Sequence, residues 1–377
     1  MEFRDLKSQY RAMQPEMDAA VKAVLDQGAF IMGQPVRDLE SELAAYVGVR
    51  HCLTCASGTD ALTLSLMAMG VGAGDAVFVP DFTFFASAEC VALVGAEPVF
   101  VDVCADTFNI NTDDLERAVA ATVAAGRLTP KAIIAVDLYG LPADYDAIRV
   151  IARKYNLAVI EDGAQAFGGQ IDGRRACSFG DMSATSFFPA KPLGCYGDGG
   201  AVFTDDDRLA EMVSSLRVHG KGTGKYDNVR IGLNSRLDTL QAAILQVKLK
   251  AFDSRELDAV RRIAGLYTEQ LSEAVRVPVI PDGYASAWAQ YTIRLSGRVE
   301  RDAVKAALQE AGIPSMVYYP KPLHKQEAFA GLASADACPV ATRLCDEVLS
   351  LPMHPYLTDR EIGIICSQVK QSLERVR

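Results

Sequence analysis

Short runs of β-forming residues recur between residues 56 and 204, and helical patterns separate several of them. The runs are AVFVP (76–80), PVFVDV (98–103), KAIIAVDL (131–138), LAVIED (157–162) and AVFT (201–204). Residues 113–124 and 143–155 carry apolar side chains at helical spacing. Strands that alternate with helices in this way predict an α/β fold with a mostly parallel central sheet covered by helices.

The pattern changes after residue 216. The polar, glycine-rich stretch 217–236 predicts a long, ordered functional loop. A long helix is expected over 237–271, followed by a strand at 289–295 and helices at 299–311, 337–349 and 358–374. We therefore predict a large domain over residues 1–250, which includes the N-terminal segment, and a smaller α+β domain over residues 251–377.

Charge and hydropathy exclude several classes of partner. The 377 residues carry a formal net charge of −10, which gives no basic excess to attract nucleic acid. The longest uncharged run, residues 61–74, is shorter than the roughly 20 residues that span a bilayer. Charged residues at positions 2, 4, 5 and 7 stand where a secretory signal has its apolar core, so we expect a cytoplasmic protein.

An anion site is predicted where SGT (57–59) precedes an apolar helical pattern. The free amides at the start of a helix attract phosphate, so Gly58 and Thr59 are candidates. An ordinary capped helix is the alternative interpretation of this motif alone.

Acidic residues are expected at the carboxyl edge of the sheet, where open parallel sheets bind ligands. Asp137 and Asp162 both follow apolar runs and are candidates for that edge. A carboxylate there could hold a cationic ring nitrogen or a metal, or it could simply form a turn or cap a helix.

Lys191 has an unusual setting for a lysine, since it lies between Pro189 and Pro192 in SFFPAKPLG. Apolar surroundings lower the pKa of an amine and favour the neutral nucleophile. An anion site, a strand-end carboxylate and a nucleophilic lysine together match pyridoxal phosphate (PLP), which has a phosphate, a ring nitrogen and an aldehyde.

The sequence also resembles a known family, the DegT-like nucleotide-sugar aminotransferases. The matching segments span nearly the whole chain and include DLKSQY, SGTDAL, PDFTFFA, EDGAQAFGG, SFFPAKPLGCYGDGG, GLNSRLDTLQAA, YYPKPLHKQ and LSLPMHPYL. The resemblance implies a PLP-dependent transferase of fold type I. Within the family, the sequence is most similar to transaminases that aminate C3 of UDP-2-acetamido-2-deoxy-3-oxo-glucuronate.

The resemblance also implies roles for individual residues. Lys191 would form the Schiff base with the cofactor, and Asp162 would pair with its ring nitrogen. Phe84 would stack on the ring, Gln165 would face the ring oxygen, and Ser186 would join Gly58 and Thr59 at the phosphate. Asn234 would reach the phosphate of the neighbouring subunit in a homodimer with shared sites. The substrate would contact Arg236, Tyr318, Tyr319 and His324.

The implied reaction transfers an amino group from L-glutamate to a UDP-linked keto-sugar, in biosynthesis of a bacterial surface polysaccharide of the O-antigen type. A 4-keto-6-deoxy nucleotide sugar is the alternative acceptor. A PLP-dependent sugar dehydratase and a non-catalytic regulatory protein are further alternatives. Relatives with dehydratase chemistry replace the Schiff-base lysine by histidine, whereas this chain has Lys191.

We predict no metal site from the sequence. Cys52 and Cys55 form one C-x-x-C pair, but no second pair follows at the spacing of a zinc site. The four histidines are dispersed along the chain.

Overall fold

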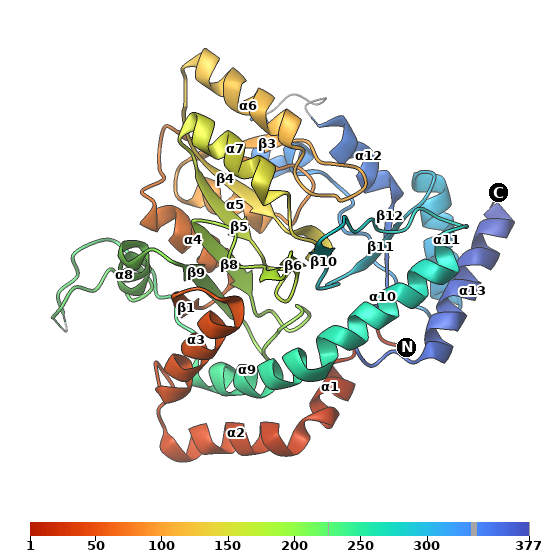
Figure 1. The fold of residues 1–377 in the computed structure, drawn as a ribbon, viewed down its shortest axis with the longest axis horizontal. Helices are drawn as coiled ribbons and strands as arrows, with labels where there is room; N and C mark the ends of the chain where they lie inside the picture. The colour runs from red at the N-terminus through yellow and green to blue at the C-terminus, as the bar shows by residue number, and fades with distance from the viewer. Residues whose placement is uncertain (225, 333–337, 377) are drawn as a thin grey trace.

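The computed structural model describes residues 1–224, 226–332 and 338–376, and its centre is a seven-stranded sheet with the order β1-β9-β8-β5-β4-β2-β3 (Figure 1). Strand β9 runs antiparallel to its neighbours β1 and β8, while the other neighbouring strands are parallel. The predicted mostly parallel sheet is therefore confirmed. The strands are β1 (His51–Cys55), β2 (Asp75–Pro80), β3 (Glu97–Val101), β4 (Thr129–Val136), β5 (Ala158–Asp162), β8 (Met182–Ser186) and β9 (Gly200–Thr204).

Helices cover both faces of the sheet. Because successive side chains of a strand point to opposite faces, apolar residues are needed on both sides. Val77 and Val79 pack in one cluster with residues of α4 (Gly58–Ala68), α5 (Ala86–Leu93) and α8 (Asp207–Leu216). Phe78, between them, packs on the opposite face with residues of α6 (Thr112–Ala125) and α7 (Tyr145–Tyr155). The helices predicted over 113–124 and 143–155 are thus confirmed as layers on this second face.

The predicted long helix over 237–271 is also confirmed. It consists of α9 (Thr239–Ala251), a π-helical turn η2 (Phe252–Glu256) and α10 (Leu257–Leu271). Figure 1 shows it running from beneath the sheet to the C-terminal elements. One hydrophobic cluster joins residues of α3 (Gln34–Val47), α9, α10 and α13 (Asp359–Val376), so the apolar core continues along this helix. The domain boundary near residue 250 falls inside the helix and stays a prediction.

One C-terminal prediction needs correction. The helix expected over 337–349 is α12 (Pro339–Glu347), with residue 337 outside the described residues, and residues 348–351 form strand β12 instead. Strand β12 is fully buried and pairs antiparallel with β11 (Tyr291–Arg294). The apolar run 348–351 could by itself extend the helix, but pairing with this distant strand makes it extended.

The remaining elements complete the chain. The helices are α1 (Leu6–Ala12), α2 (Gln14–Gln27), α3 (Gln34–Val47), α11 (Arg298–Glu310) and α13 (Asp359–Val376). The short elements are β6 (Gln170–Ile171), β7 (Arg174–Arg175), β10 (Tyr284–Ala285), η1 (Leu138–Gly140), η3 (Leu323–Lys325) and η4 (Glu327–Phe329). Across the described residues, no helix combines the length and the apolar character that crossing a membrane requires.

Lys248 of α9 is buried, and its amine has no hydrogen-bond partner among the described residues. Its Nζ lies 4.7 Å from the centre of the Tyr196 ring. Burial lowers the pKa of Lys248 to about 7, although the Glu256 carboxylate opposes this shift. Below pH 7 the amine is charged in both the folded and unfolded protein, so the folded state then bears the full cost of burying the charge. As the pH rises from 7 towards the ordinary pKa of a lysine, the amine loses its proton in the folded state, and the free-energy cost of burying the charge decreases.

We expect Lys248→Met to raise the free energy of unfolding by about 3 kcal/mol more at about pH 6 than at about pH 9.5. Denaturant unfolding at the two pH values measures this difference. Lys250→Met is the matched control, because Lys250 lies on the same helix and is exposed. An equal effect of Lys248→Met at both pH values would contradict the buried charge.

Candidate active site

A cavity of about 700 Å³ lies at the carboxyl edge of the sheet, beside the start of α4. It brings together most of the residues predicted for the site, although they come from segments far apart in the sequence. The predicted residues that line it are Gly58, Thr59, Phe84, Asp162, Gln165, Ser186, Lys191, Tyr318 and Tyr319.

Lys191 reaches the cavity from a tight turn after β8. Its backbone N–H donates to the carbonyl of Phe188 at 2.9 Å. Burial lowers the pKa of the Lys191 amine, and the nearby Asp162 carboxylate partly opposes that shift. The amine therefore loses its proton more readily than an exposed lysine, which suits a nucleophile and a base.

Asp162 ends strand β5 and is buried. Its Oδ2 accepts a hydrogen bond from Ser87 Oγ at 2.7 Å, and its Oδ1 accepts one from the Ala164 N–H at 3.2 Å. Burial raises the pKa of this carboxyl group, against the hydrogen bond from Ser87 and the charge of Lys191. A cationic group in the cavity would stabilise the charged form.

The start of α4 forms the predicted anion cradle. Ser57 caps the helix, with its Oγ accepting from the Asp60 N–H at 3.0 Å. Among the described residues, no acceptor is assigned to the amides of Gly58 and Thr59, so both remain available to a ligand. A Cβ atom at position 58 would lie 2.7 Å from Ser186 Cβ, so only glycine lets the Ser186 hydroxyl approach the helix start this closely.

Aromatic and amide side chains form the wall of the cavity. Phe84 is 54% exposed, and its ring centre lies 6.2 Å from that of Tyr319. Gln165 Nε2 donates to the Tyr319 hydroxyl at 3.1 Å, and its Oε1 accepts from the Tyr139 N–H at 2.7 Å. These bonds fix the Gln165 amide against the aromatic wall.

These features fit PLP. The buried carboxylate of Asp162 has only neutral hydrogen-bond donors, which suits a protonated ring nitrogen. The amides at Gly58 and the Ser186 hydroxyl suit a phosphate, Phe84 offers a ring face, and Lys191 offers an amine. The chemical groups that the cofactor requires therefore line one cavity.

Three predicted residues do not line this cavity in their own chain. Asn234 is exposed, and its Oδ1 accepts a hydrogen bond from Arg236 Nη2 at 2.5 Å. Both lie at the base of the 217–236 loop, which stands away from the sheet beside α8 (Figure 1). A role for either at this chain's own Lys191 is not supported, whereas a contribution to a partner's site stays a prediction.

His324 is also outside the cavity. Its N–H donates to Asp81 Oδ1 at 2.7 Å, and its Nδ1 lies 2.5 Å from Asp81 Oδ2. Both residues are buried, and together with Cys338 they form a cluster whose candidate metal-ligand atoms lie within 4.8 Å of one another. The hydrogen bonds between His324 and Asp81 anchor the segment that follows Tyr319. In this chain His324 therefore stabilises the cavity wall without lining the cavity.

Asp137 lies at the same edge of the sheet as Asp162 but does not line the cavity. Its Oδ1 accepts from the Ala143 N–H at 2.9 Å and from the Tyr145 hydroxyl at 2.8 Å. Asp137 therefore stabilises the turn after β4, in agreement with the alternative interpretation of such an aspartate.

Other lining residues were missed in the sequence. Gln290 presents a buried Oε1 that has no hydrogen-bond partner among the described residues. Lys321 adds a basic side chain from the YYPKPLHKQ segment. Ser87 does not line the cavity but donates to Asp162, and nothing in the sequence around PDFTFFASAEC indicated this contact.

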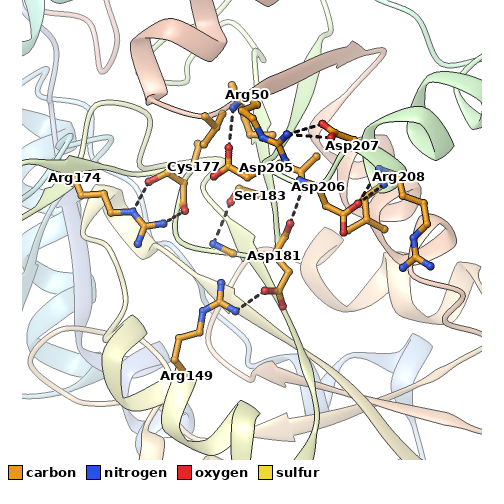
Figure 2. Close-up of a pocket in the computed structure, with 16 residues that line it drawn as sticks. Arg50, Arg149, Arg174, Cys177, Asp181, Ser183, Asp205, Asp206, Asp207 and Arg208 are labelled. Carbon is orange, nitrogen blue, oxygen red and sulfur yellow. Dashed lines mark hydrogen bonds and ion pairs between the residues drawn. The ribbon is translucent and has the colours of Figure 1, made fainter.

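A second hollow, of about 770 Å³, has a different set of lining residues, and half of them are charged (Figure 2). Two ion pairs lie in it: Arg50 lies 2.9 Å from Asp207, and Arg149 lies 2.5 Å from Asp181. Arg174 donates to Ser178 Oγ at 3.1 Å. None of the predicted site residues lines this hollow, so the cavity that contains Lys191 is the candidate active site.

Comparison with known proteins gives matches over nearly the whole chain. The sequence profile of the DegT/DnrJ/EryC1/StrS aminotransferase family matches residues 11–370. UDP-2-acetamido-2-deoxy-3-oxo-D-glucuronate aminotransferase from Pseudomonas aeruginosa is 46% identical, covering 97% of this chain and 99% of the relative. UDP-N-acetyl-3-dehydro-α-D-glucosamine 3-aminotransferase from Acidithiobacillus ferrooxidans is 45% identical, covering 98% and 97%.

Solved structures agree with these matches. A DegT DnrJ EryC1 StrS aminotransferase from Brucella abortus is 51% identical with a TM-score of 0.96, covering 98% of this chain and 99% of that one. The PLP form of Spr1654 from Streptococcus pneumoniae is 26% identical with a TM-score of 0.88, covering 96% and 97%.

Proposed function

The chain belongs to the DegT/DnrJ/EryC1/StrS aminotransferase family, and we propose that it transfers the amino group of L-glutamate to C3 of UDP-2-acetamido-2-deoxy-3-oxo-glucuronate. It is a PLP-dependent sugar aminotransferase. The observation that carries the proposal is the convergence of Lys191, Asp162 and the amide cradle of Gly58 on one cavity. The similarity to a 3-oxo-glucuronate aminotransferase over nearly both chains supports the acceptor.

The cavity residues divide the work of amino transfer. PLP, when bound, supplies an aldehyde that takes up the amine and a ring that accepts electrons. Asp162 would keep the proton on the ring nitrogen, and Gly58 with Ser186 would hold the phosphate. Phe84 would lie on the ring face. Lys191 Nζ, with its lowered pKa, would remove the proton from Cα of the amino donor and later return a proton to the product carbon.

The acceptor is tested with purified enzyme, L-glutamate and a panel of keto-sugars. We expect transfer to the 3-keto glucuronate, with kcat/KM well above that for a 3-keto UDP-sugar without a carboxylate and for a 4-keto-6-deoxy sugar. A higher kcat/KM for the 4-keto-6-deoxy sugar would replace the proposed acceptor with the alternative. Mass spectrometry and NMR of the product identify the aminated carbon.

Arg236 is the proposed ligand of the uronate carboxylate in the site of a partner subunit, because a guanidinium binds carboxylates through two hydrogen bonds. Arg236→Ala should lower kcat/KM for the uronate by about 10- to 100-fold, which corresponds to a lost hydrogen bond to a charged group. The control is the matched 3-keto sugar without a carboxylate, whose kcat/KM should fall much less. Equal losses for the two sugars would remove Arg236 from uronate recognition.

We also propose a homodimer with shared active sites. In the 217–236 loop, Ile231 is 89% exposed and Val229 is 54% exposed, and apolar side chains that gather on an exposed loop are typical of a surface that contacts another protein. Asn234 lies at the base of the same loop and, by the resemblance, would donate to the phosphate in the partner's site. The exposed loop supports a contact between subunits.

Mixing inactive subunits tests this arrangement. Lys191→Ala and Asn234→Ala chains should each be inactive, yet a random mixture should recover about a quarter of wild-type activity, because half of the dimers would hold one intact site. Native mass spectrometry verifies that heterodimers form. Verified heterodimers without activity would place Asn234 in its own chain's site or in a purely structural role.

The biological setting follows from the proposed acceptor. A 3-amino uronate linked to UDP would serve biosynthesis of a bacterial surface polysaccharide of the O-antigen type, in the cytoplasm. Because this setting is inferred from the acceptor alone, the acceptor assay tests it as well.

A further inference from the structure

The N-terminal segment contacts the peptide of the catalytic lysine from behind the cavity. Arg4 Nη2 donates a hydrogen bond to the Lys191 carbonyl at 2.8 Å and approaches the Pro192 carbonyl at 3.5 Å. Arg4 Nη1 donates to the Met353 carbonyl at 3.4 Å. We propose that Arg4 is a positioning residue for amino transfer, which fixes the peptide from which the Lys191 side chain extends.

Arg4 completes the fixation of the Lys191 backbone. The Lys191 N–H already donates to the Phe188 carbonyl at 2.9 Å, so Arg4 binds the other polar group of the Lys191 backbone, its carbonyl. Pro189 and Pro192 restrict the chain on both sides of the lysine. With the backbone held in this way, the amine can vary its position only through the side-chain torsions.

The guanidinium is itself well anchored. The Phe3 carbonyl accepts a hydrogen bond from the Met353 N–H at 3.2 Å, which ties the N-terminal segment to the turn after β12. Asp5 then caps α1, accepting from the Ser8 N–H at 2.8 Å. Arg4 therefore joins the lysine turn to the turn after β12, and its planar fork of donors bonds to a carbonyl on each.

The neighbouring charge favours a guanidinium at this position. Burial lowers the pKa of Arg4, and the Glu256 carboxylate opposes this shift. Glu256 in turn accepts a hydrogen bond from Gln9 Nε2 at 3.1 Å and from the Tyr356 hydroxyl at 2.5 Å. This carboxylate therefore compensates the partly buried cation.

Arg4 does not line the cavity, so it acts only through Lys191. Displacing a reacting group by a fraction of an ångström to 1 Å lowers the rate strongly and leaves the affinity for substrate largely unchanged. We therefore expect Arg4→Met to lower kcat by about 10- to 100-fold, with KM for L-glutamate changed about twofold or less.

The test compares Arg4→Met, Arg4→Gln and Arg4→Lys with Arg11→Met, which replaces an exposed arginine of α1. Hydrogen exchange of the apoprotein should show faster exchange in the 188–195 turn of Arg4→Met, and the absorbance pH titration of the PLP-loaded protein should shift. Arg4→Lys, which keeps a charged donor, should recover part of both kcat and the titration. Arg11→Met should match the wild type.

The melting temperature of each apoprotein separates positioning from stability. If Arg4→Met lowers the melting temperature but leaves kcat and the absorbance titration unchanged below it, Arg4 is only structural and the proposal is overturned. If Arg4→Met does not fold, Arg4→Gln and Arg4→Lys decide by the same measurements. A wild-type kcat in Arg4→Gln would equally overturn the proposal.

Discussion

Replacing Lys191 by alanine is expected to lower kcat for amino transfer by about four orders of magnitude, because in the proposed reaction this one side chain would both hold the cofactor and move the proton. The amine lies in the cavity, and its pKa is lowered by burial. Alanine has no group that can perform either task. Single-turnover reactions with L-glutamate, followed by the absorbance of the cofactor, measure the loss.

Two controls accompany Lys191→Ala. Lys250→Ala removes an exposed lysine of α9 and should leave kcat unchanged. Added methylamine should restore part of the activity of Lys191→Ala, since a free amine can replace the missing base. A Lys191→Ala rate within tenfold of the wild type would contradict the assignment.

Asp162→Asn is expected to have the second-largest effect, with kcat lowered about 100- to 1,000-fold. Asparagine has nearly the same shape and can still accept from Ser87, but it carries no charge to keep the ring nitrogen protonated. Cofactor binding should persist, because the amide cradle at Gly58 is unchanged. Single-turnover kinetics and a cofactor titration separate the two effects.

Ser87→Ala is the matched control for Asp162→Asn. It removes the hydroxyl that lies 2.7 Å from Asp162 Oδ2 but leaves the carboxylate in place. We expect a loss of about tenfold or less, the equivalent of one hydrogen bond. If Asp162→Asn loses no more than Ser87→Ala, the charge of Asp162 is not what the reaction uses.

The sequence was informative where a signal is local. Apolar runs such as 157–162 predict β5, and the motif that follows places Asp162 at the carboxyl edge, where the structure has it. The turn around Lys191 and the helix start at Gly58 are likewise encoded within a few residues. The direction of a strand is not encoded locally. The run 201–204 resembles the other predicted strands, yet β9 lies antiparallel between β1 and β8.

Weak strands escaped prediction for a related reason. Strand β1 has the sequence HCLTC and β8 has MSATS, and neither is rich in β-branched or large apolar residues. Their pairing within the sheet, with β9 between them, compensates for low intrinsic preference.

Apart from the shared cofactor site, individual contacts between distant segments could not be predicted from the sequence. Arg4 and Lys191 are 187 positions apart, and His324 and Asp81 are 243 positions apart. No periodicity or local motif relates such pairs, so the contacts behind the proposed positioning role of Arg4 and the anchoring of His324 emerge only from the fold. Asn234 is a different case, because its predicted partner belongs to a second subunit, and Arg236 does not line the cavity of its own chain.

The central claim is that the cavity around Lys191 is where the cofactor is held, and covalent mapping tests it most directly. Borohydride reduction of the PLP-loaded enzyme fixes the cofactor to the lysine that holds it, and peptide mass spectrometry then locates the modification. Besides Lys191, the chain offers a buried amine at Lys248 and another cavity lysine at Lys321. The account predicts stoichiometric modification of Lys191. Modification of Lys248 or Lys321 with Lys191 unmodified would contradict it.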